Sequence, residues 1–183
     1  MPTQQPSRAK PNLVFLAART IRIGFDAYEW RESFYESQKN VDPLGVVACF
    51  RNEPSSEGRV IEANGVRAQI IYRNQDGQET GIVPRACWLQ DCADTVDLPA
   101  GESHCVILAI LRQDGSLVAP WRRRVTAIDG HRGQVITTEA YQFDKRVSSI
   151  EIRILGESNE FLLSPLTFDF CVAEGRPTAV RRP

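Results

Sequence analysis

Three groups of side chains in this sequence could carry out chemistry: five cysteines, two histidines, and a tryptophan followed by three arginines. Cys87 and Cys92 form the closest cysteine pair. Zinc ligands usually occur as two closely spaced pairs, and the second pair is missing here. We therefore interpret Cys87 and Cys92 as ordinary cysteines near a strand end, and we expect neither a metal site nor a cofactor.

The histidines give little support to nucleophilic catalysis. His104 and Cys105 are neighbours on a predicted strand, so their side chains should point to opposite faces and cannot easily form a nucleophile–base pair. His131, in a predicted turn, could act as a base only if the fold brings it to a thiol. The sequence contains no phosphate-binding glycine loop and no G-x-S-x-G motif, and its carboxylates are dispersed. We predict a protein that is not an enzyme, with no catalytic residues.

The run Trp121-Arg122-Arg123-Arg124 is the one local feature that stands out. Tryptophan and arginine are enriched at protein-interface hot spots, and together they could also stack on a base while contacting phosphates. The plainest interpretation is a strand whose alternate residues face opposite ways, with some arginines paired to nearby acids. A protein interface ranks next, followed by a nucleic-acid contact.

Trp30 is the second candidate for partner binding. Ala27, Trp30 and Phe34 are spaced three and four apart, as residues on one face of a helix are. Asp26, followed three residues later by Glu29, resembles a capping box at the start of that helix. The sequence therefore predicts a short helix or structured insertion near residues 26–41. A cap over an open end of the fold is the favoured role, and a partner site is the alternative.

The elements that must position these residues read as strands. Three apolar runs dominate the chain, are rich in β-branched residues and are separated by turn residues; they are Gly45–Phe50, Val66–Tyr72 and Cys105–Leu111. Asp76-Gly77 and Asp114-Gly115 are strong turn signals. The connections are too short for crossover helices. We predict an all-β fold: a two-sheet antiparallel sandwich of about 8–10 strands.

The predicted organisation has three parts. Residues 1–11, with three prolines, should form a flexible arm, and residues 12–174 the sandwich domain. Residues 175–183 should form a basic C-terminal tail that frays. Pro84 should place the first half of the strand Gly81–Gln90 at an edge or a bulge.

Five motifs follow one another within about residues 45–111: Phe50-Arg51-Asn52, Val66–Tyr72, Asp76-Gly77, Trp88-Leu89 and Asp97–Glu102. In these motifs the chain resembles uncharacterised bacterial immunoglobulin-like sandwich domains. The resemblance implies that the predicted two-sheet antiparallel sandwich of about 8–10 strands is immunoglobulin-like. In antibody-type domains a core tryptophan follows the first cysteine of the inter-sheet disulfide within about a strand and a turn. Trp88 is much too far from Cys49, so we do not expect a Cys49–Cys105 disulfide.

Composition narrows the function classes. A net charge of −1 provides no global attraction to nucleic acid or to an anionic membrane. The longest apolar runs fall far short of the ~20 residues that are needed to cross a bilayer. The segment Met1–Pro6 lacks the basic region followed by an apolar region that is typical of a signal peptide. An odd, scattered set of cysteines is typical of reduced thiols in the cytoplasm.

These observations together predict a cytoplasmic binding or assembly module that acts through protein–protein contacts or self-association, without membrane insertion. Its candidate contact residues are Trp121, Arg122, Arg123, Arg124 and Trp30. A nucleic-acid-associated accessory domain that uses Arg122–Arg124 is the alternative, and an enzyme with an unrecognised site is third. The physical basis is that exposed edge strands of a sandwich accept partner strands unless they are guarded.

Overall fold

The computed structural model describes residues 10–23, 43–54, 58–59, 61–89, 93–112, 114–126, 134–143 and 146–183. Within 121–126 and 134–141 it describes the backbone alone. The helix or insertion predicted near residues 26–41, with Trp30, lies outside the described residues, as do Cys92 and His131.

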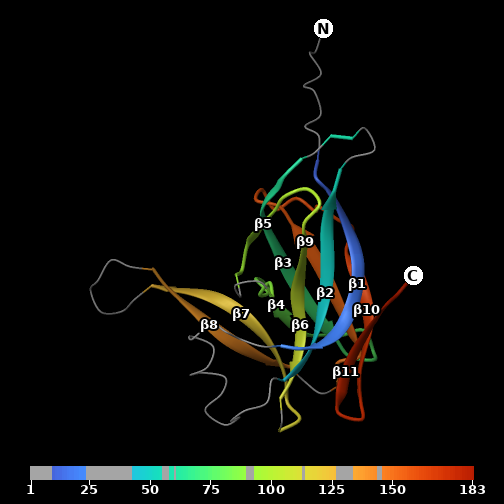
Figure 1. Ribbon diagram of the computed structural model, residues 1–183. Coiled ribbons are helices and arrows are strands. Elements are labelled where there is room, and N and C mark those ends of the chain that lie inside the picture. The colour runs from blue at the N-terminus through green and yellow to red at the C-terminus, as the bar shows by residue number, and fades with distance from the viewer. Residues whose placement is uncertain are drawn as a thin grey trace.

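The described part of the chain is all-β and contains eleven strands (Figure 1). In chain order they are β1 (Asn12–Arg22), β2 (Leu44–Glu53), β3 (Ala63–Arg73), β4 (Glu79–Val83), β5 (Val96–Leu98), β6 (Ser103–Leu111), β7 (Leu117–Thr126), β8 (Gln134–Phe143), β9 (Ser149–Leu155), β10 (Leu166–Ala173) and β11 (Arg176–Arg181). No helix long and apolar enough to span a bilayer occurs among the described residues.

The strands form two antiparallel sheets that pack face to face. The first sheet has the order β1-β2-β6-β7-β8, and the second has the order β11-β10-β9-β3-β4, with β5 paired to β3. The predicted two-sheet sandwich is therefore confirmed, with one strand more than the upper end of the expected range. The three apolar runs of the sequence became β2, β3 and β6, which lie at or next to the centre of their sheets.

The main core lies between the sheets and is built by strand alternation. Val46, Ala48 and Phe50 of β2 face β3 and β9 residues such as Ile70 and Ile152, and all of these are buried. Intervening residues of β2 and β6 belong to a second apolar cluster on the outer face of the first sheet, which includes Val47, Cys49, Cys105 and Ile107. Because both faces of β2 and β6 are covered, these strands read as continuous apolar runs.

The chain after β4 passes from the second sheet to the first. Ala86 N donates a hydrogen bond to Ala68 O of β3 at 2.9 Å. Two residues on, Trp88 pairs with Val106 of β6, and Leu89 N donates to Cys105 O at 2.7 Å. The predicted strand Gly81–Gln90 is thus divided between the two layers.

Two predictions are wrong. Cys49 and Cys105 form a disulfide, because they lie directly opposite each other on β2 and β6, with Cα atoms 4.0 Å apart. This pair lies within one sheet, so the spacing rule for an inter-sheet disulfide did not apply to it. The cysteines are therefore not all reduced.

The second error is the C-terminal boundary. Residues 176–181 form β11, which pairs with β10 along its whole length, so the sandwich does not end at residue 174. Glu174 and Gly175 have φ values of 52° and 71°. Positive φ at both central residues is the geometry of a two-residue hairpin turn, which returns the chain along β10 instead of releasing it as a tail.

Candidate protein-binding ribbon

Strands β7 and β8 form a hairpin that extends away from the sandwich (Figure 1). Their pairing is continuous from Leu117–Phe143 at the sandwich to Thr126–Gln134 at the far end. By contrast, β6 pairs with β7 only through Ile110–Val118 and Leu111–Leu117. Beyond that point the hairpin is a two-stranded ribbon, which we call the β7–β8 ribbon and define as residues 121–126 and 134–139.

The ribbon leaves the first sheet because another segment takes its place beside β6. Cys87 N donates a hydrogen bond to Pro120 O of β7 at 3.3 Å, and Ile107 N of β6 donates to Cys87 O at 3.0 Å. The segment Cys87–Leu89 therefore contacts β6 where β7 would otherwise continue. Strand β7 is displaced outward from Pro120 onward.

Aromatic packing fixes the base of the ribbon in the core. The Phe143 ring stacks on Tyr72 of β3 at a centroid distance of 4.2 Å and meets Phe170 of β10 edge-on at 6.3 Å. Tyr72 Oη donates a hydrogen bond to Leu108 O of β6 at 2.6 Å. Tyr72 therefore links both sheets to the base of the ribbon, so the ribbon projects from a rigid support.

The predicted run Trp121-Arg122-Arg123-Arg124 occupies the first half of the ribbon. In the backbone register Trp121 lies opposite Glu139 and Arg123 opposite Thr137. These four residues are thus the first to leave the sandwich. Trp30, the other predicted contact residue, lies outside the described residues, so the structure does not bring it to the ribbon.

Both long margins of the ribbon are strand edges. Among the described residues, no strand pairs with the outer margin of β8 or with β7 beyond Pro120. Unpaired backbone N–H and C=O groups along such a margin form a template for another strand. In the sequence, residues 121–139 carry four arginines against one aspartate and one glutamate, whereas the whole chain has a net charge of −1.

The other residues considered for chemistry remain apart. His104 Nε2 lies 3.7 Å from Glu102 Oε2, and its ring meets buried Trp88 edge-on, while Cys105 belongs to the cluster on the opposite face of β6. The predicted separation of His104 and Cys105 is therefore confirmed. No cluster of three or more His, Cys, Asp or Glu side chains that could hold a metal occurs within the described ranges.

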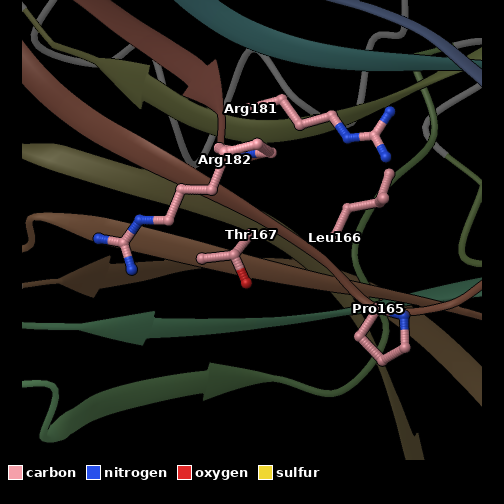
Figure 2. Close-up of a pocket in the computed structure, with 6 residues that line it drawn as sticks. Pro165, Leu166, Thr167, Arg181 and Arg182 are labelled. Atoms are coloured by element: carbon pink, nitrogen blue, oxygen red, sulfur yellow. The ribbon is translucent and has the colours of Figure 1, made fainter.

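A shallow hollow of about 270 Å³ lies beside the C-terminal strand and is lined by Pro165–Thr167 and Arg181–Pro183 (Figure 2). Its two arginines point to opposite sides. Arg182 is paired with Asp169 at 2.7 Å, and the Arg181 guanidinium lies 5.4 Å from the Phe15 ring centroid. Because the two guanidinium groups do not point to a common position, the hollow does not form an anion-binding site.

Sequence reasoning identified the tryptophan–arginine run but not its setting. The projection of the ribbon depends on Cys87–Leu89 contacting β6, which is a long-range contact without a local signal. Pro84 predicted an edge or a bulge for the first half of that strand, and β4 does lie at an edge of the second sheet, but nothing in the sequence indicated that the second half contacts β6. In comparisons with known proteins, no family model, curated protein or solved structure matches this chain.

Proposed function

We propose that this protein is a binding or assembly module whose contact element is the β7–β8 ribbon. The observation that carries the proposal is the departure of β7 from β6 after Pro120, which leaves two strand margins without a partner among the described residues. A partner strand added to such a margin forms hydrogen bonds between its own main chain and the main chain of the ribbon, and these bonds give affinity. Side chains such as Trp121 then provide specificity.

Strand energetics support the same proposal. A two-stranded hairpin is marginally stable in water, and three or more strands or a packed face are needed for independent stability. The ribbon has a rigid base at Tyr72 and Phe143, but beyond Pro120 the described residues show only the pairing of β7 with β8. A third strand, from a partner protein or a second copy of this chain, would complete it.

The sequence motifs shared with immunoglobulin-like domains support placing the protein in that broad class, within the proposal. A cytoplasmic location is also part of the proposal, and it requires the Cys49–Cys105 disulfide to be catalytic or redox-sensing, because other disulfides are rare in the cytosol. The odd, scattered cysteines do not support this location by themselves, since two of them are bonded to each other.

A ribbon-trimmed variant tests the proposal. Pro120 and Ala140 lie opposite each other, so replacing residues 121–139 with Asn-Gly closes the hairpin with a favoured two-residue turn and keeps Phe143 in the core. We expect an unchanged unfolding midpoint together with loss of self-association in light scattering at micromolar concentration, or loss of the partner in a pull-down. A wild-type protein that is monomeric without a partner, or a trimmed variant that binds equally well, would contradict the proposal.

A nucleic-acid contact is the second candidate, favoured by the two-stranded form of the ribbon and its three consecutive arginines. The major groove of DNA admits a two-stranded β-ribbon, and phosphate contacts by arginine make affinity fall steeply with salt. Titration of duplex DNA at several salt concentrations tests this function. Binding that the triple variant Arg122→Ala, Arg123→Ala, Arg124→Ala loses would support it, and no binding of the wild type at low salt would end it.

A further inference from the structure

We infer that the Cys49–Cys105 disulfide is a thiol–disulfide exchange site, at which an external dithiol attacks Cys105 and releases Cys49. Two observations carry this inference: the unequal exposure of the two cysteines, and the guanidinium beside Cys49. It concerns the outer face of β2 and β6 and does not depend on the ribbon as a binding element.

Exposure selects the sulfur that is attacked. Cys49 is 1% exposed, whereas Cys105 is only partly buried. Which sulfur an incoming thiolate can reach is a major determinant of exchange rate and direction. Cys105 is therefore the electrophile, and Cys49 is the leaving group.

A cation is positioned at the leaving group. Arg19 Nη2 of β1 lies 3.7 Å from Cys49 Sγ and donates a hydrogen bond to it. The sulfur that departs carries negative charge, and a nearby guanidinium stabilises a thiolate. Because Arg19 is exposed and its field is screened by water, we expect this stabilisation to change the rate several-fold and not by orders of magnitude.

The electron balance of the exchange is complete with a dithiol. One thiolate of the reductant bonds to Cys105 Sγ, the Cys49–Cys105 bond breaks, and its electron pair leaves with Cys49. The second thiol of the reductant then attacks the reductant's first sulfur, which is bonded to Cys105 in the mixed disulfide. This step releases Cys105 and gives two protein thiols and an oxidised, cyclic dithiol. With a monothiol, the first step alone leaves an adduct on Cys105.

The position of Cys105 connects this site to the base of the ribbon. Cys105 O accepts a hydrogen bond from Leu89 N, in the same short segment whose Cys87 N donates to Pro120 O. Reduction removes the covalent bond between β2 and β6 next to that segment. The exchange site therefore lies directly beside the residues that set where β7 leaves the sheet.

The experiment measures reduction of the folded protein by dithiothreitol, with alkylation of the products and mass spectrometry of each cysteine. Cys171, an exposed cysteine outside the disulfide, serves as the internal reference for alkylation. We expect Arg19→Gln to slow reduction about three- to tenfold and Arg19→Lys to restore most of the rate. Arg73→Gln, which makes the same charge change on the second sheet, should leave the rate unchanged.

A second measurement locates the attack. Incubation with reduced glutathione, followed by rapid alkylation, should give a glutathione adduct on Cys105 and an alkylated Cys49. Three results would overturn the inference: an adduct mainly on Cys49, reduction that requires denaturant, or an Arg19→Gln variant that is reduced at the wild-type rate.

Discussion

Asn52, near the end of β2, is a fully buried polar residue whose side chain donates hydrogen bonds to main-chain carbonyl groups of other segments. Its Nδ2 donates to Ile61 O at 2.7 Å and to Leu98 O at 2.8 Å. Its backbone N donates to Glu102 O, and its backbone O accepts from Gly101 N. One residue therefore connects the end of β2 to the segment before β3, to the end of β5 and to the turn between β5 and β6.

Replacing Asn52 with alanine should destabilise the fold. Asn52→Ala leaves two carbonyl groups without their donor, at least one of them buried, and we expect a loss of about 2–3 kcal/mol in the free energy of unfolding. Urea denaturation followed by tryptophan fluorescence measures this. Asn12→Ala, which removes a single exposed hydrogen bond to Pro54 O, is the matched control and should change the value by less than about 0.5 kcal/mol. Equal losses of unfolding free energy in the two variants would contradict the stabilising role given to the Asn52 hydrogen bonds.

At the scale of the element, the strands and turns were the most predictable features. The apolar runs identified β2, β3 and β6, and Gly77 and Gly115 adopt φ values of 76° and 77°, as their turn signals require. Local sequence suffices for these features because a core strand and a tight turn each depend on a few adjacent residues.

Features that depend on pairing between distant strands could not be predicted. The disulfide requires Cys49 and Cys105 to be opposite each other in register, although 56 residues separate them in sequence. Strand β11 depends on a turn at Glu174-Gly175, which lacks the asparagine or aspartate of the usual turn signal. The tryptophan–arginine run was visible, but its position on a projecting hairpin follows from contacts of Cys87–Leu89 and not from its own residues.

Strand β11 should contribute measurably to stability. Truncation after Gly175 removes the pairing with β10, the buried ring of Pro177 and the hydrogen bond from Thr20 Oγ1 to Pro177 O at 2.6 Å. We expect a loss on the order of 3 kcal/mol in the free energy of unfolding, from several hydrogen bonds of modest net value. Urea denaturation tests this, with removal of Pro183 alone as the control. A truncated protein with the wild-type midpoint would indicate a dispensable tail.

At the scale of the whole molecule, the disulfide constrains the unfolded chain. It closes a loop of 56 residues in sequence separation, for which the chain-entropy model predicts stabilisation of about 4 kcal/mol, within a usual range of about 2–4. Reduced protein should therefore unfold at a lower urea concentration than oxidised protein. Thermal and urea unfolding of both forms measures the difference, with Cys171→Ser as a control that should not alter it. Identical midpoints would show that the bond does not contribute.

The passage of the chain between the layers after β4 has a mechanical consequence. Beside β4, pulling the two sheets apart would stretch the covalent chain that runs from one sheet to the other. It would also have to break the main-chain hydrogen bonds of Ala86 and Leu89 together. On the opposite side, β1 meets β11 through the Thr20 side chain and the contact of Arg181 with Phe15. Under tension the sandwich should therefore open first along the β1–β11 margin, while the margin beside β4 acts as its hinge.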